Sequence, residues 1–187
     1  MRLTKLLFLC LVFTASLVGS NINAAHLVGG ESSYQCVGGN TYAVKLRVYR
    51  DCGGGGAQFD TQAVITIFDI GGVVIQNLMI PKGPTITISG NPTNDPCITV
   101  PGGLCTEYAE YHDTVFLPPI AGGYVLTHQR CCRNNSITNV ANSGNWGNTY
   151  TVDIPDMDTT CNSSPNFVGN APSVICIGDN LNLPITA

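Results

Sequence analysis

Charged residues are scarce in this sequence. Only eight of its 187 residues are Lys or Arg and twelve are Asp or Glu, so charged residues make up 11% of the chain. That fraction is less than half of the roughly 25% found in ordinary globular domains. Coiled coils and charge-rich disordered chains are therefore excluded. The net charge of −4 also excludes the basic surface that nucleic-acid binding needs, so we expect no nucleic-acid partner.

Long apolar runs are equally rare, and the one that occurs lies at the start of the chain. Arg2 and Lys5 precede thirteen uncharged residues at 6–18, and a small, polar stretch follows. This three-part pattern is typical of a secretory signal peptide, and its apolar part is too short to cross a bilayer comfortably. No comparable run follows. We therefore expect a secreted or cell-surface protein whose mature chain does not span the membrane.

Cleavage of this segment removes one of the nine cysteines. The small residues favour cleavage after Ala25, with Ser20 and Ala24 as alternatives. Cys10 lies within the apolar part, so eight cysteines remain in the mature chain. An even number in an exported chain indicates a disulfide framework. Its predicted members are Cys36, Cys52, Cys97, Cys105, Cys131, Cys132, Cys161 and Cys176.

The pairing within this framework is open, because eight cysteines can pair in about a hundred ways. Cys97 and Cys105 flank a Pro-Gly-Gly turn, which favours a local bond between them. A bond between Cys161 and Cys176 is a second candidate. A disulfide that joins this domain to a following module fits equally well.

Cys131 and Cys132 are adjacent at the end of a predicted strand. Adjacent side chains of a strand point to opposite faces, so we expect these cysteines to bond to different partners rather than to each other. With His128 they also resemble a set of metal ligands, but disulfides fit an exported chain better. The sequence therefore predicts no metal here and indicates no cofactor.

The middle of the chain alternates between apolar and polar residues with the period of β-strands. In segment 41–48, the apolar side chains from Tyr42 to Val48 share one face, while Lys45 and Arg47 lie on the other. Further strands are predicted at 62–69, 73–80, 85–89, 106–117, 123–132 and 148–154, with a hairpin turn at 71–72.

These segments predict an all-β fold, an antiparallel immunoglobulin-like β-sandwich stapled by disulfides, with no significant helix outside the signal peptide. About seven or eight strands separated by loops rich in Gly, Pro and Asn favour it over a parallel α/β sheet. Residues 1–25 are the predicted signal peptide and 26–160 the sandwich domain. The predicted linker and first strand of a further module occupy 161–187, so we expect the chain to be a fragment of a longer protein.

The sequence indicates no catalytic site. His112 and His128 are the internal histidines, and no nucleophile motif surrounds any serine or cysteine. Three carboxylates after the last strand, Asp153, Asp156 and Asp158, are candidates for a calcium site. Their spacing is not that of an EF-hand, so this calcium site has little support. We expect a protein that is not an enzyme.

Three aromatic residues are candidate ligand contacts. Trp146, the one tryptophan, lies in the Asn-rich loop NSGNWGN. An exposed indole among amides can stack on a sugar ring, although such a side chain more often anchors its own loop. Tyr108 and Tyr111 are further candidates.

Several segments resemble the N-terminal region of large exported proteins of Bacteroidota that are associated with gliding motility or type IX secretion. The most specific are VYRDC at 48–52 and QRCCRNN at 129–135, and the resemblance covers essentially the whole mature chain. In such proteins the region precedes cadherin-like, immunoglobulin-like or PKD-like repeats and a C-terminal sorting domain. The resemblance therefore implies that this region has downstream repeats as partners, either in the same chain or in a related chain.

These observations favour a non-enzymatic structural or adhesion module at the N-terminus of a larger cell-surface protein. The alternative is a carbohydrate-binding module of a secreted protein. The expected partners are then surface glycans or other cell-surface proteins.

Overall fold

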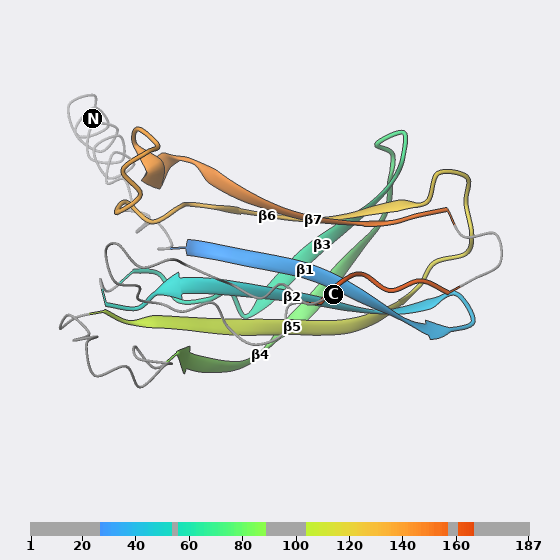
Figure 1. Ribbon diagram of the computed structural model, residues 1–187, viewed down its shortest axis with the longest axis horizontal. Helices are drawn as coiled ribbons and strands as arrows, with labels where there is room; N and C mark the ends of the chain where they lie inside the picture. The colour runs from blue at the N-terminus through green and yellow to red at the C-terminus, as the bar shows by residue number, and fades with distance from the viewer. Residues whose placement is uncertain (1–26, 54–55, 89–103, 157–160, 167–187) are drawn as a thin grey trace, which may run out of the picture.

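The computed structural model describes residues 27–53, 56–88, 104–156 and 161–166 (Figure 1). These residues form antiparallel strands and one short 3-10 helix, so the predicted all-β fold is confirmed. The elements are β1 (Leu27–Gly38), β2 (Thr41–Asp51), β3 (Gln62–Asp69), β4 (Val74–Ile88), β5 (Thr106–Phe116), β6 (Tyr124–Cys131), η1 (Ser143–Asn145) and β7 (Gly147–Ile154). Within the described ranges, no helix is both long and apolar enough to cross a membrane.

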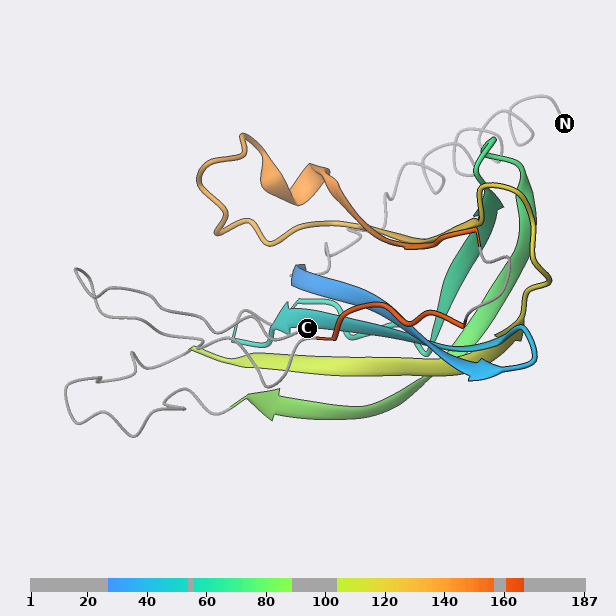
Figure 2. The same ribbon diagram turned by 45° about the vertical axis from the view of Figure 1, so that its right-hand side comes forward.

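The strands are hydrogen-bonded in the order β1-β2-β5-β4-β3-β6-β7. The first half of β4 pairs with β3, and its second half, from Lys82, pairs with β5. The first sheet therefore contains β1, β2, β5 and the end of β4, and the second sheet contains the start of β4, β3, β6 and β7. Figure 2 shows these two layers, connected by β3 and β4. Immunoglobulin constant-type domains divide their strands between two sheets in this order, so the immunoglobulin-like topology is confirmed.

The core lies between the two layers and follows the predicted alternation. On β2, the side chains at even positions from Tyr42 to Val48 are buried, as are Ala109 and Tyr111 on β5. The buried apolar side chains are Leu27, Tyr34, Tyr42, Val44, Leu46, Val48, Phe59, Ala63, Ile65, Ile67, Ile80, Ala109, Tyr111, Val115, Leu117, Tyr124, Leu126 and Ile154.

A tyrosine corner connects β5 to β6. The hydroxyl of Tyr124, at the start of β6, donates a hydrogen bond to the carbonyl oxygen of Pro118 at 2.5 Å. Immunoglobulin-like domains often contain such a tyrosine at the corner before this strand. The preceding Gly123 has a φ of 76°, and a Cβ there would collide with the carbonyl oxygen of Ile154. The turn therefore requires glycine at this position.

The prediction of two separate strands at 73–80 and 85–89 is wrong, because β4 is continuous from Val74 to Ile88. Pro81, Gly83 and Pro84 resemble a break in the sequence. In the structure they lie where β4 leaves β3 and joins β5, and the register shifts between Lys82 and Thr85.

The first strand, β1, was not predicted, and residues 161–166 run along its free edge (Figure 1). The backbone N–H of Tyr34 donates to Oγ of Ser164 at 2.9 Å, and the N–H of Ser164 donates to the carbonyl oxygen of Tyr34 at 3.0 Å. The N–H of Cys36 donates to Oγ of Ser163 at 3.1 Å. An uncovered edge strand invites pairing with other chains, and this segment covers the edge of β1 at Tyr34 and Cys36.

A disulfide between Cys36 and Cys161 fixes the same segment covalently, with a Cα–Cα distance of 5.7 Å. The predicted pairing of Cys161 with Cys176 is therefore wrong. The sequence offered no local reason for this bond, because its two cysteines are 125 residues apart. Cys176 and the rest of 167–187 lie outside the described residues, so the predicted further module stays a prediction.

On the side of the sandwich away from β4, β1 of the first sheet contacts β7 of the second sheet. A Cβ at Gly30 would lie 2.7 Å from the ring of Tyr150, so the ring occupies the space that a side chain would need. The Tyr150 ring also stacks on His128, with centroids 6.4 Å apart, and burial raises the pKa of Tyr150 to about 12. His128 is itself buried, and its Nδ1 donates a hydrogen bond to the carbonyl oxygen of Val64. This histidine is a core residue.

Candidate binding surface at the loop end

The two ends of the sandwich differ in their connections. At one end the chain turns within seven residues or fewer, at 39–40, 70–73 and 117–123. At the other, which we call the loop end, the connections after β2, β4 and β6 each span ten residues or more. In immunoglobulin variable domains the binding loops cluster at one end of the sandwich. The loop end corresponds to the end at which those binding loops lie.

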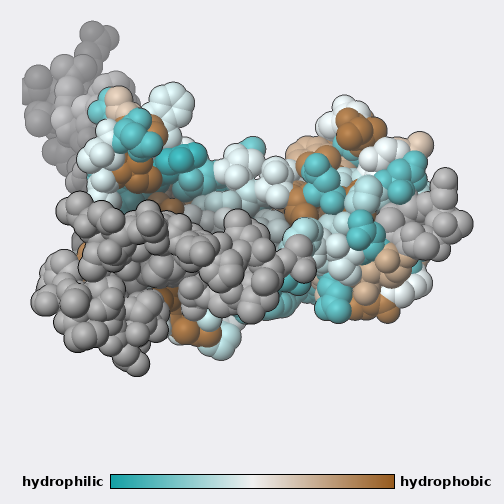
Figure 3. Space-filling view, in the orientation of Figure 1, coloured by the Kyte–Doolittle hydropathy of each residue, from teal (hydrophilic) through white to brown (hydrophobic). Residues whose placement is uncertain are grey.

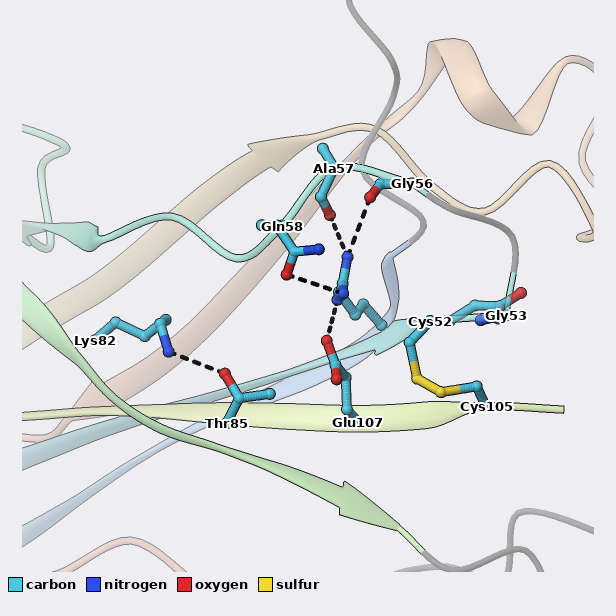
Figure 4. A network of polar contacts seen from close by, with 11 residues as sticks. Cys52, Gly53, Gly56, Ala57, Gln58, Lys82, Thr85, Cys105 and Glu107 are labelled. Carbon is cyan, nitrogen blue, oxygen red and sulfur yellow. Dashed lines mark hydrogen bonds and ion pairs between the residues drawn. A yellow bond between two sulfur atoms is a disulfide. The ribbon is translucent and has the colours of Figure 1, made fainter. Parts of the chain in front are cut away.

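A disulfide between Cys52 and Cys105 joins the ends of β2 and β5 at the loop end (Figure 4). The backbone N–H of Cys52 also donates to the carbonyl oxygen of Cys105 at 2.9 Å. The predicted local bond between Cys97 and Cys105 is therefore wrong. The antiparallel pairing of β2 with β5 brings Cys52 beside Cys105, and this proximity decides the pairing. Cys97 lies outside the described residues.

A buried arginine holds the connection after β2. The Arg50 side chain is 6% exposed and forms an ion pair with Glu107 of β5. Its guanidinium also donates to the carbonyl oxygens of Gly56 and Ala57, at 3.2 and 2.6 Å, and to the amide oxygen of Gln58 at 3.1 Å. Figure 4 shows these four acceptors converging. A buried guanidinium is stable only when its donors have acceptors, so the loop is folded around this charge.

Cys131 and Cys132 are bonded to each other, so the prediction that they bond to different partners is wrong. That prediction placed both residues in one strand. In the structure β6 ends at Cys131 and Cys132 lies outside the strand, so the alternation rule does not apply to the pair. Cys131 is exposed at the start of the connection to β7.

Asn134 fastens the β6–β7 connection to the rest of the domain. It is 5% exposed, and its N–H donates to the carbonyl oxygen of Leu27 at 3.0 Å. Its side-chain amide donates to Asp51 at 3.1 Å and accepts from the N–H of Ser136 at 3.1 Å. Its carbonyl oxygen accepts from the Ser143 hydroxyl at 2.9 Å. The backbone and side chain of this one buried residue thus connect the loop to β1, to β2 and to itself.

The segments 48–52 and 129–135 therefore meet at the loop end. Asn134 of the second segment donates to Asp51 of the first. Arg130 of the second forms an ion pair with Asp60, in the loop that Arg50 of the first holds. The two sequence patterns on which the resemblance rests thus brace the same surface.

Trp146 stands exposed on this braced loop. Its side chain is 60% exposed, yet its indole Nε1 donates to the carbonyl oxygen of Ala141 at 3.1 Å. Its backbone N–H donates to Ser143 at 3.0 Å, and its carbonyl oxygen accepts from the N–H of Arg133 at 2.9 Å. The indole is therefore held in one orientation while its rings contact solvent. A rigid, exposed aromatic ring gives contact area at low entropic cost.

The other two aromatic candidates do not join Trp146. Tyr111 is 2% exposed, its hydroxyl donates to the carbonyl oxygen of Asp60 at 2.8 Å, and burial raises its pKa to about 12. Tyr111 is therefore a core residue, and its prediction as a ligand contact is wrong. Tyr108 lies on the outer face of the first sheet, where the guanidinium of Arg47 is 4.8 Å from its ring centroid. Trp146 belongs to the other layer.

The outer face of the first sheet carries a row of charges. Arg47 pairs with Glu31 at 3.1 Å and with Glu110 at 2.5 Å, and His112 lies 2.8 Å from Glu110. Burial alone would raise the pKa of Glu110, but hydrogen bonds from His112 and Arg47, together with their charges, hold it below its ordinary value. These contacts give His112 a place in an ion-pair network.

A groove of about 470 Å³ lies beside this row. The described residues that line it are Ser33, Tyr34, Gln35, Ala43, Val44, Lys45, His112, Asp113, Thr114 and Asn166. None of the three aromatic candidates is among them, so the groove and the loop end are separate places.

The candidate calcium ligands receive no support. Asp153 is exposed on β7, and the carboxylate of Asp156 accepts a hydrogen bond from the N–H of Gly122 at 3.1 Å. Asp158 lies outside the described residues. Within the part of the chain that the structure covers, no three His, Cys, Asp or Glu side chains form a group that could hold a metal ion.

The residues that build the loop end were only partly foreseen. The sequence singled out Trp146 and the cysteines, but not Arg50, Asn134 or Ser143, which fix the loops. A signal for two of them was present, because Arg50 and Asn134 belong to the two most specific segments. Comparison with protein-family models, with curated proteins and with solved structures finds no match.

Proposed function

We propose that this chain is a non-enzymatic extracellular adhesion module that binds through the loop end. It is exported by a signal peptide cleaved near Ala25 and forms the N-terminal part of a larger cell-surface protein. The resemblance to the N-terminal region of Bacteroidota surface proteins, associated with gliding motility or type IX secretion, supports this setting. Its disulfides are typical of proteins that fold outside the cytoplasm.

The observation that carries the proposal is the set of contacts that holds the β6–β7 connection around an exposed Trp146. Loops that serve only to connect strands need no buried arginine, buried asparagine and two disulfides. Loops that bind a partner gain affinity when their binding conformation is already fixed, because less entropy is lost on binding. The β6–β7 connection combines such fixing contacts with an exposed aromatic residue.

Retention of beads on cells tests the proposal. Beads coated with the purified chain are flowed over a layer of Bacteroidota cells, and Trp146→Ala should reduce the number retained at least tenfold. Phe116→Ala is the matched control, because Phe116 is equally exposed at 61% but lies at the other end of the sandwich. Equal retention by Trp146→Ala and the unchanged chain, or no retention by either, would overturn the proposal.

Trp146 also favours a second candidate, a carbohydrate-binding module. A fixed, exposed indole on an Asn-rich loop can stack on a sugar ring while neighbouring amides bond to its hydroxyls. A glycan array distinguishes the two candidates. Binding to any glycan that is lost in Trp146→Ala supports the carbohydrate module, whereas retention on cells without binding to the array supports a protein partner.

A further inference from the structure

The first half of β4 is an edge strand without the usual protection. Its inner edge pairs with β3, and no described strand pairs with the outer edge of Val74–Ile80. On such an edge every second residue directs its N–H and C=O away from the sheet. Proteins ordinarily protect these groups with charged side chains, bulges or covering segments. Residues 161–166 cover β1 in that way at Tyr34 and Cys36, whereas no described segment covers the outer edge of Val74–Ile80.

Residues 70–81 contain no charged side chain. Several apolar side chains along this segment are unusually exposed, namely Ile70 at 70%, Val73 at 60%, Val74 at 51%, Ile75 at 49% and Met79 at 58%. Figure 3 shows hydrophobic side chains gathered over the β3–β4 hairpin. Apolar side chains beside unpaired backbone groups are the chemistry of a strand that pairs with another strand.

We propose that this edge pairs with the same edge of a second copy of the chain, joining two second sheets into one continuous sheet across a two-fold axis. The two β4 strands run antiparallel, with Asn77 of each copy opposite Asn77 of the other. In this register Ile75 of each copy lies opposite Met79 of its partner, so two exposed apolar side chains of the strand cover one another twice.

The charges that bound the segment select the same arrangement. Asp69 ends β3, and its carboxylate lies beside the hairpin turn, 3.3 Å from the position of a Cβ on Gly71. Lys82 begins the second half of β4. With Asn77 on the two-fold axis, Lys82 of one copy lies opposite Gly72 of the other, next to Asp69. A negative charge at one end and a positive charge at the other attract only in an antiparallel pair, which makes the segment complementary to itself.

The expected dimer is small and reversible. Pairing of seven residues extends over roughly 23 Å at about 3.3 Å per residue, which places the contact near the low end of specific interfaces. Association should therefore depend on protein concentration. The closed two-fold arrangement uses the outer edge of β4 in both copies, so it stops at two chains.

Sedimentation velocity of the purified chain from about 1 µM to about 1 mM tests the proposal. A dimer with an interface of this size should go from mostly dissociated to mostly formed over that range of protein concentration. A monomer–dimer equilibrium is expected, and Ile75→Lys should weaken it at least tenfold without lowering the melting temperature. Val37→Lys is the matched control, since Val37 is 56% exposed but lies on β1.

Hydrogen exchange locates the contact. Backbone amides within Val74–Ile80 should exchange more slowly at high concentration than at low concentration, and the difference should vanish in Ile75→Lys. A monomer at every concentration would overturn the proposal. A dimer that Ile75→Lys leaves intact, or one without concentration-dependent protection on β4, would overturn it as well, because the contact would then lie elsewhere.

Discussion

Replacing Arg50 with methionine tests whether a buried charge holds the β2–β3 loop. Methionine keeps much of the volume of the side chain but removes every donor. Glu107, whose side chain is 13% exposed, then remains buried without its partner, and the carbonyl oxygens of Gly56 and Ala57 lose their hydrogen bonds. Breaking a buried ion pair from one side typically lowers the free energy of unfolding by about 3–5 kcal/mol. We expect a loss in that range.

The double variant Arg50→Met/Glu107→Met should be more stable than Arg50→Met alone. It removes the unpaired carboxylate and leaves only neutral carbonyl oxygens without partners, which cost about 1–3 kcal/mol. Urea denaturation of the oxidised protein measures both variants, and Lys45→Met serves as the control. Lys45 lies on the same strand but points outward, so its replacement should change stability by no more than about 0.5 kcal/mol.

Two results would refute this reasoning. The first is a loss below about 1 kcal/mol for Arg50→Met, which would mean that the loop does not depend on the guanidinium. The second is a double variant less stable than Arg50→Met, because the carboxylate would then stabilise the fold without its partner.

Three further predictions concern stability. Cys36→Ser should lower the free energy of unfolding by about 4–5 kcal/mol, since its bond to Cys161 closes a loop of 125 residues; urea denaturation measures this, and an unchanged midpoint would contradict it. Glu110 has a pKa held below its ordinary 4.5, so the stability it contributes should be present above pH 4.5 and lost as the pH falls through the lower folded value. As the pH falls below 4.5, the melting temperature should decrease less steeply for Glu110→Gln than for the unchanged chain, and parallel curves would count against the ion pair. Gly30→Ala should cost about 1–3 kcal/mol by pushing on the ring of Tyr150, whereas Gly29→Ala, with nothing near its Cβ, should be mild in the same denaturation assay.

The sequence predicted the strands with a clear local pattern and missed those shaped by their neighbours. Segment 41–48 alternates clearly, segment 62–69 is β-branched and almost wholly apolar, and β2 and β3 contain them. By contrast, β1 is rich in Gly and Ser, and it is a strand because β2 and residues 161–166 pair with its two edges. The prolines of β4 resemble a break but mark the passage between sheets. Such features depend on tertiary pairing, which local periodicity does not encode.

The disulfides show the same limit. Cys52 meets Cys105 because two strands pair, and Cys36 meets Cys161 because a distant segment covers an edge. Spacing favours near neighbours and so favoured the wrong pairs. Among the aromatic candidates, Tyr111 is two residues from Ala109 on β5, so the two side chains share a face of the strand, and both are buried. Only the folded loop shows why Trp146 remains exposed.

The distance in sequence between β1 and residues 161–166 also sets the order of events in folding. At about 5–20 residues per second, synthesis delivers Cys161 about 6–25 s after Cys36, from which it is separated by 125 residues. During that interval β1 can pair with β2 but has an open outer edge, and the thiol of Cys36 has no native partner. Newly made chains are then most prone to cross-link or pair with one another. Residues 161–166 thus end this period, and a folding catalyst would be needed most just before they arrive.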